Sequence, residues 1–315
     1  MLKTLMWRLF MAGVTLLIVS MLLFAGTELL PGDTATTSLG QAATEEAKAA
    51  IRNELGLDRP AVIRYGEWLS AALQGDLGTS YTSRRAVADE ILPRLGNTMF
   101  LAAYAAVIGV PLALAIGVTS AIWRNSFYDR VMSILCLVLA SFPAFFVAYL
   151  LIAVLSVRFN LLPSISSTFP GMSFAEKLHV TSLPMIGLVL MIVPHIARMT
   201  RAAIFDVWSS AFIEMALIKG VKRSRAIWAH ALPNALAPII SVIALNLAFL
   251  LTGVLIIEVI FVYAGLGPYM VDAVALRDMP TVQAAGVLFA MVFILLNLIA
   301  DMAVILANPK LRHPK

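Results

Sequence analysis

Ionisable side chains inside long apolar stretches are the residues of this chain with most scope for chemistry. Glu258 and Asp301 lie in such stretches, where an ionised carboxylate costs about 2.5–3.5 kcal/mol on insertion scales. His195 has no second His or acid placed to form a metal site with it. The sequence also lacks a Gly-x4-Gly-Lys-Ser/Thr phosphate loop, a His-Glu-x-x-His motif and a Gly-x-Ser within an apolar stretch. We therefore expect a protein that is not an enzyme and has no metal site.

The two acids each have a structural and a functional interpretation. Glu258 lies five residues before Tyr263. It either snorkels at the membrane boundary or lines the outer part of a polar pathway near a subunit interface. Asp301 lies near the inner end of its stretch, and we expect it to pair with Arg198 or Arg201 at a similar depth.

The composition places these residues in a membrane protein. Of 315 residues, 61% are apolar and 13% are charged, against about 45–50% and about 25% in soluble domains. So little polar surface cannot cover so large an apolar core. Six continuous stretches reach the length of about 20 residues that a spanning helix needs, the fourth only narrowly; they are 9–30, 99–123, 131–157, 180–197, 235–262 and 284–307. The sequence predicts an all-α polytopic membrane protein with six transmembrane helices.

Positive charge indicates the orientation. Segments 1–8, 124–130, 198–234 and 308–315 together hold 13 Lys and Arg residues, whereas 158–179 and 263–283 hold three. Positive residues concentrate in cytoplasmic loops, so we expect both termini in the cytoplasm and no nucleic-acid partner. The length of the first stretch and the bulky residues after it favour a retained anchor over a cleaved signal.

The chain divides into an anchor, an external segment, a core and a tail, with expected bounds 1–30, 31–98, 99–307 and 308–315. We expect the external segment to be a small subdomain of short helices. Thr44-Glu45-Glu46-Ala47 has the pattern of a capped helix start, and 64–73 has the pattern of a second helix.

The internal segment 198–234 carries the main functional signal. Residues 202–218 include Asp206 and Glu214 and are too few and too charged to span. Helical spacing gives this stretch one apolar stripe, made of Trp208, Ala211, Phe212, Met215 and Ile218. Gly220 follows as a helix stop. Such a helix lies either on lipid or in a groove of a cytoplasmic partner, and the pattern alone does not choose between them.

The order of residues in this segment resembles a known motif. Residues 212–221, followed by Ile227 and Leu232-Pro233, resemble the cytoplasmic loop of ABC importer permeases, which reads Glu-Ala-Ala, three residues, Gly, nine residues and an apolar-x-Leu-Pro ending. This chain departs from the motif in having the bulkier Met215 for the first Ala and Ile218 for a later small residue.

Further blocks resemble the peptide and nickel branch of that family, and its B-type permeases in particular. They occur in the family's order along nearly the whole chain: Leu29-Leu30-Pro31-Gly32-Asp33, Leu55-Gly56-Leu57-Asp58-Arg59-Pro60, Gly75-Asp76-Leu77-Gly78-Thr79-Ser80, Ser141-Phe142-Pro143, Glu258-Val259-Ile260-Phe261 and Asp278-Met279-Pro280. So many blocks in order make the resemblance specific.

The resemblance implies one of two similar permease subunits, forming a heterodimer in the bacterial inner membrane. Two cytoplasmic ATPases holding ATP and magnesium, and an extracytoplasmic substrate-binding protein, would complete the complex, and this chain would bind no cofactor. The residues expected to couple to an ATPase are Phe212, Glu214, Met215, Ala216, Ile218, Lys219 and Gly220. Those expected in the translocation pathway or its gate are Glu258, Phe261, Ser141 and Pro143. Gly220 also fits a plain helix stop, and Pro143 a plain kink.

Peptides are the substrates that the resemblance suggests first. Nickel chelates, glutathione and oligosaccharides are alternatives, because similar permeases carry them. A secondary transporter or channel would also explain six spans and two buried acids. It needs no shared cytoplasmic motif, however, and we find no internal repeat of the kind that such carriers often have.

Overall fold

The computed structural model describes residues 2–29, 34–39, 43–169 and 171–307. The regular structure of these residues is helical, apart from one isolated antiparallel bridge between Thr79 and Ala86. The chain forms two compact units. Unit 1 comprises the described residues up to Thr98 together with Ala264–Ile294, and unit 2 comprises Met99–Tyr263 with the described residues from Leu295. The all-α prediction is confirmed.

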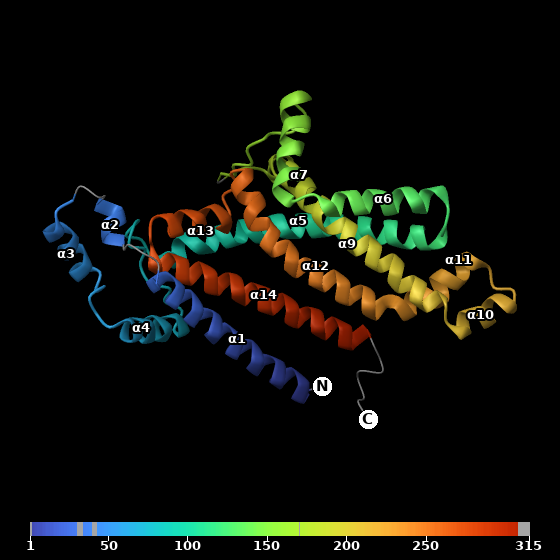
Figure 1. The fold of residues 1–315 in the computed structure, drawn as a ribbon, viewed down its shortest axis with the longest axis horizontal. Coiled ribbons are helices and arrows are strands. Elements are labelled where there is room, and N and C mark those ends of the chain that lie inside the picture. The colour runs from blue at the N-terminus through green and yellow to red at the C-terminus, as the bar shows by residue number, and fades with distance from the viewer. Residues whose placement is uncertain (1, 30–33, 40–42, 170, 308–315) are drawn as a thin grey trace. The chain divides into compact units, whose positions relative to one another are not determined.

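The helices are labelled in Figure 1. Unit 1 contains α1 (Leu2–Leu29), α2 (Thr34–Leu39), α3 (Glu45–Glu54), α4 (Ala61–Leu73) and α13 (Leu266–Ala275). Unit 2 contains α6 (Phe127–Ser141), α7 (Ala144–Leu151), the π-helical η1 (Ile152–Arg158), α8 (Phe174–Val180), α9 (Ser182–Trp208), α10 (Ala211–Ile218), α11 (Arg223–Ala226), the π-helical η2 (Ile227–Ala231) and α12 (Leu232–Ile260). Helices α5 (Val87–Ile122) and α14 (Met279–Ala307) each contribute to both units.

Five helices are long and apolar enough to cross a membrane, namely α1, α5, α9, α12 and α14. The third predicted stretch, 131–157, is not one straight helix. It breaks between α6 and α7, whose arms meet at 103° and make a sixth span if the bent pair is counted as one. Pro143 has no N–H and disfavours a helical conformation at the residue before it, and Phe142 is accordingly extended (φ −87°, ψ 136°).

Several predicted bounds were too narrow. Helix α5 begins at Val87 instead of 99, α9 ends at Trp208 instead of 197, and α14 begins at Met279 instead of 284. Hydropathy marks only the apolar part of a helix, whereas the helix continues through polar turns at its ends. In α5 the added first turn carries Asp89 and Glu90, which the helix dipole stabilises.

Short helices follow α1 in unit 1, as the sequence indicated. The Thr44 side chain caps α3 by accepting a hydrogen bond from the Ala47 amide at 3.3 Å. Helix α4 begins at Ala61, after Pro60, and is a turn longer than the expected 64–73.

A buried carboxylate holds the end of this external segment in unit 1. Asp278 accepts hydrogen bonds from the Ser80 hydroxyl and, at 3.0 Å, from the Tyr81 amide. The Val87 amide donates to the Gly78 carbonyl at 2.9 Å, so the turn before α5 is held on both sides. Two blocks of the sequence that lie some 200 residues apart therefore meet at one joint.

The start of α5 is also fastened to α13 within unit 1. The Tyr269 hydroxyl donates to Glu90 Oε2 at 2.9 Å, and the Arg94 guanidinium lies 4.3 Å from the centre of the Tyr269 ring. Burial, helped by the nearby Glu90 carboxylate, raises the pKa of Tyr269 to about 12. The Leu266 amide donates to Thr98 Oγ1 at 2.9 Å.

The core of unit 2 is built around α9 and α12, which lie side by side (Figure 1). Helices α6 and α7 pack against α9, and α7 also contacts α12. Helix α5 approaches α9 closely at Gly117, where an added Cβ would lie 2.7 Å from the Ala197 carbonyl oxygen and from Thr200. This packing positions the segment that follows α9.

Candidate functional site

The internal segment forms two helices, not the single one expected over 202–218. Helix α9 ends at Trp208, and α10 begins at Ala211 after an extended Ser210 (φ −80°, ψ 147°). Serine side chains compete for backbone hydrogen bonds and favour such breaks, and the Ser210 hydroxyl donates to the Val207 carbonyl oxygen. The predicted apolar stripe is therefore divided, because Trp208 belongs to α9.

The end of α10 has the geometry of a glycine stop. Gly220 adopts φ +84°, its amide donates to the Leu217 carbonyl at 2.9 Å, and the Val221 amide donates to the Ala216 carbonyl at 3.1 Å. These two bonds form a Schellman motif, in which glycine is favoured because a side chain is strained at positive φ. No atom lies within 4 Å of a Cβ added at Gly220, so within this chain its backbone conformation is what calls for glycine.

One side chain anchors α10 to the rest of unit 2. Ile213 is fully buried in an apolar cluster. The buried members come from α5, α9, η2 and α12 as well as α10, and are Val118, Ala121, Ala203, Ile204, Ile213, Ile227, Ala231, Ala235 and Ile239. A helix this short is not stable alone, so Ile213 holds it in a defined position.

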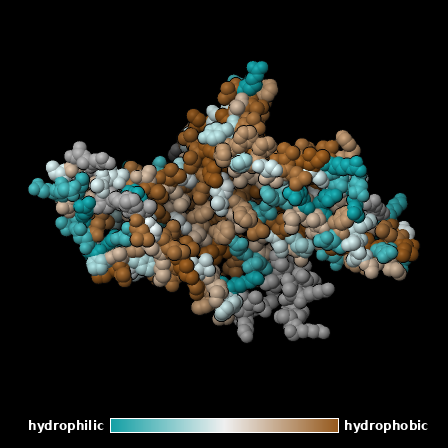
Figure 2. All heavy atoms as spheres, viewed as in Figure 1, coloured by the Kyte–Doolittle hydropathy of each residue, from teal (hydrophilic) through white to brown (hydrophobic). Residues whose placement is uncertain are grey.

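The other side of α10 is an exposed apolar surface. Phe212, Met215 and Ile218 are 48%, 53% and 71% exposed. Glu214 and Lys219 are exposed beside them, and Ala216 is half-buried. Figure 2 shows hydrophobic side chains next to hydrophilic ones over α10. We call Phe212, Met215 and Ile218 the α10 face.

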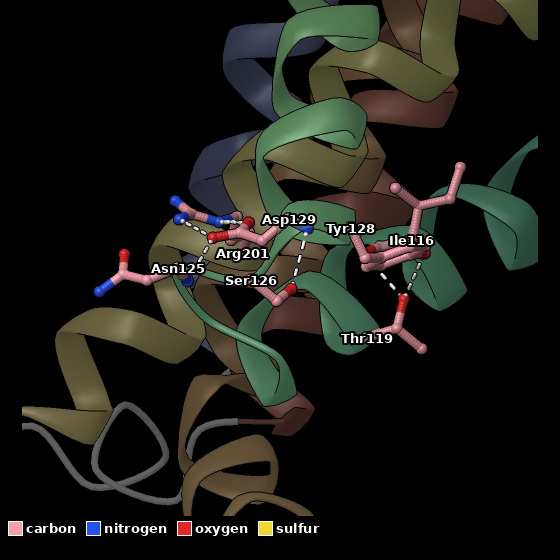
Figure 3. A network of polar contacts seen from close by, with 7 residues as sticks. All are labelled: Ile116, Thr119, Asn125, Ser126, Tyr128, Asp129 and Arg201. Atoms are coloured by element: carbon pink, nitrogen blue, oxygen red, sulfur yellow. Dashed lines mark hydrogen bonds and ion pairs between the residues drawn. The ribbon is translucent and has the colours of Figure 1, made fainter.

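A buried ion pair links α9 to the start of α6 (Figure 3). Arg201 donates from Nε to Asp129 Oδ1 at 2.7 Å and from Nη2 to Asp129 Oδ2 at 2.8 Å. The Asn125 amide donates to Asp129 Oδ2 at 3.0 Å, and Ser126 caps α6 by accepting from the Asp129 amide. Two parallel bonds to a carboxylate fix both the distance and the orientation of the partners.

This ion pair corrects one prediction. We expected Arg198 or Arg201 to pair with Asp301, but the carboxylate that binds Arg201 is Asp129. The first turn of α6 brings Asp129 to the side of α9 that carries Arg201. The sequence contained a signal for this position, because Ser126-x-x-Asp129 before an apolar run is a capping pattern.

The same contacts fasten α6 to α5 and to the end of α9. Tyr128 and Thr119 hydroxyls are 2.9 Å apart, and Thr119 also donates to the Ala115 and Ile116 carbonyls (Figure 3). The Arg124 guanidinium lies 3.5 Å from the centre of the Phe205 ring, a cation–π contact one turn before α9 ends. The supports of α10 therefore include polar contacts as well as apolar ones.

The residues expected in a pathway or gate are of two kinds. Glu258 and Phe261 are fully buried, and the Phe261 carbonyl accepts from the Ser166 amide at 2.9 Å. Ser141 and Pro143 lie exposed at the bend between α6 and α7, and the Ser141 hydroxyl donates to the Leu137 carbonyl. Neither buried side chain lines an open surface of this chain, and a role in transport stays a prediction for all four.

Comparisons with known proteins now bear on this arrangement. A family described as "Binding-protein-dependent transport system inner membrane component" matches residues 109–313, and its N-terminal counterpart matches residues 1–102. The chain belongs to this family. The glutathione transport system permease protein GsiC is 37% identical over 299 residues in Salmonella choleraesuis (strain SC-B67) and in Escherichia coli (strain K12), covering 95% of each chain.

A solved structure shares the fold. The methionine ABC transporter MetNI, in an inward-facing conformation, gives a TM-score of 0.52 at 19% identity and covers 70% of this chain and 96% of that one. As a family member, the chain is a multi-pass permease subunit of an ABC importer in the inner membrane, a transport component that works with ATPase and substrate-binding partners. Within the described residues, no group of three or more His, Cys, Asp or Glu side chains is arranged to hold a metal ion.

Proposed function

We propose that this subunit forms half of a pathway for short peptides and is driven by cytoplasmic ATPases through residues 205–220. The observation that carries the proposal is the α10 face, an exposed apolar surface on a helix that Ile213 anchors in the core. Such a surface fits the groove of a partner protein. Packed elements shift as units, so a movement of α10 would be passed to α5, α9 and α12 through the cluster around Ile213.

The partners in this proposal are a second homologous permease, two ATPase subunits and an extracytoplasmic binding protein. ATP and its magnesium ion are held by the ATPases, since the chain has no phosphate-binding loop. The charge distribution supports a cytoplasmic location for both termini and for α10.

The substrate class is supported by the relatives. GsiC is named for glutathione transport, and glutathione is a tripeptide with free carboxylates. It is thus a member of the class of short peptides that the sequence indicated first. Nickel chelates and oligosaccharides are the remaining alternatives.

The proposal is tested with the complete complex reconstituted in vesicles. We expect ATP-dependent uptake of labelled glutathione, dipeptides or tripeptides. Ile218→Glu, which places a charge on the α10 face, should lower both uptake and retention of the ATPases about tenfold, as the loss of one apolar contact of about 1.4 kcal/mol would. Val62→Glu is the matched control, because Val62 is an equally exposed apolar residue on α4.

Uptake that ATP does not stimulate would disprove the importer proposal for these substrates. Equal retention of the ATPases by the Ile218→Glu and Val62→Glu variants would instead disprove the assignment of the α10 face.

A further inference from the structure

Unit 2 contains a groove between α9 and α12 that no residue considered so far explains except His195. Its volume is about 570 Å³, within the range of about 300–1,000 Å³ typical of small-molecule sites. Its lining is mainly apolar and includes Met191, Met199 and Phe249. Three polar side chains also line it, namely His195 from α9 and Asn246 and Thr252 from α12.

The groove lies at the middle of two membrane-spanning helices. His195 is close to the midpoint of α9, and Asn246 is close to the midpoint of α12. Polar side chains at this depth are costly next to lipid and almost always face a protein interior or a water-filled cavity. This side of the groove therefore does not face lipid in the working complex.

The exposed face of α9 gives the groove a positive edge. Arg198 is exposed one turn after His195, and an arginine is always protonated. None of the residues that line the groove is an acid. The acid on the same face, Asp206, is eight residues beyond Arg198, or about 12 Å along the helix. The groove is thus complementary to a ligand with an apolar part and a negative charge.

We infer that this groove is a subsite of the pathway that holds an apolar side chain of a short peptide while His195 and Arg198 bind the peptide's terminal carboxylate. The inference rests on the proposed function. A helix of the second permease would fit the apolar lining, but it would bury His195 and Arg198 against an interface core, where charged residues are depleted. A solute with a carboxylate satisfies both.

The test compares a free peptide with the same peptide amidated at its C-terminus, using the whole complex. Initial uptake rates are measured with a saturating amount of loaded binding protein, so that its own preference is the same for every variant. We expect the native complex to transport the free acid faster. A hydrogen bond to a charged group contributes roughly tenfold or more, so His195→Ala should reduce the preference for the free acid about tenfold.

Two variants control this result. His195→Gln keeps an N–H donor and should retain more of the preference than His195→Ala. Met199→Leu conserves the volume of the apolar lining and should leave the preference unchanged. If neither the His195→Ala nor the Arg198→Gln complex changes the preference, although the native complex transports peptide, the inference is wrong and the proposed function stands. Absence of peptide uptake by the native complex overturns both.

A labelling experiment covers the case in which these variants do not fold. Cys136 is the only cysteine, so Thr252→Cys and Ser241→Cys can each be introduced with Cys136→Ser. Thr252 lines the groove, and Ser241 is exposed on the same helix outside it. We expect peptide to protect position 252, but not position 241, from a water-soluble maleimide. Position 252 unreactive in the assembled complex without peptide, or equal protection at both, would show that the partner permease covers the groove or that no peptide enters it, and would overturn the inference.

Discussion

Asp129 in unit 2 and Asp278 in unit 1 are both buried carboxylates, and each joins segments that are distant in the sequence. Their partners differ. Asp129 faces the guanidinium of Arg201, whereas Asp278 is held by a hydroxyl and a backbone amide, which are neutral donors. Removing the partner of a buried charge leaves that charge uncompensated, but removing one of several neutral donors leaves the others in place.

The difference shows where the chain depends on a single contact. The Asp129–Arg201 pair lies in the same unit as α10, between the elements that would pass on its movement. The Asp278 joint instead closes a turn of the external segment. We expect the first joint to fail abruptly and the second one gradually.

The largest effect is expected from Arg201→Met. This change leaves Asp129 buried without its cation, and we expect the free energy of local opening at α6 and α9 to fall by about 3–5 kcal/mol. Hydrogen exchange of the amides in residues 125–135 and 195–205 measures this opening. ATP-driven uptake should fall with it.

A double variant controls the first experiment. Adding Asp129→Asn to Arg201→Met removes the uncompensated charge and should restore part of the lost protection. Exchange in the Arg201→Met variant that matches the native protein would contradict a structural role for the ion pair.

A smaller effect is expected from Ser80→Ala. Asp278 keeps its hydrogen bond from the Tyr81 amide, so the cost should be about 1 kcal/mol. Hydrogen exchange of residues 79–87 is the measurement, with residues 125–135 as an internal control. A loss as large as that in Arg201→Met would remove the contrast between the two joints.

The smallest effect is expected from Tyr269→Phe, at the contact between α13 and the start of α5. Losing the hydrogen bond to Glu90 should cost about 1 kcal/mol or less. Because the folded state raises the pKa of Tyr269 from 10.0 to about 12, its stabilising contribution is complete below about pH 10 and is lost as the pH rises to about 12. Thermal unfolding across this range should show a steeper decline for the native protein than for the variant, and parallel curves would contradict the assignment.

Much of the fold could be predicted from sequence because hydropathy and helix length suffice to identify spans. The cap at Thr44 and the glycine stop at Gly220 were also visible, since each depends on residues within one turn. The break at Ser209 and Ser210 was missed, because the apolar spacing continues across it and only packing of Ile213 decides which face of α10 is buried.

The site was less predictable, because its contacts join distant segments. The partner of Arg201 lies 72 residues away, and the charge pattern offered Asp301 as an equally good choice. Likewise, His195 had no visible chemistry until the structure placed it opposite Asn246 in a groove. Contacts of this kind depend on which faces of two helices meet, and a single sequence does not specify that.

The elbow at Pro143 has a consequence for the surrounding bilayer. Helix α6 has 15 residues, and α7 and η1 together have 15 more, so each arm is about 22 Å long. Hydrocarbon is about 30 Å thick, and neither arm can cross it alone. Lipid beside this elbow must therefore be locally thinner, or be replaced by the side of a neighbouring subunit.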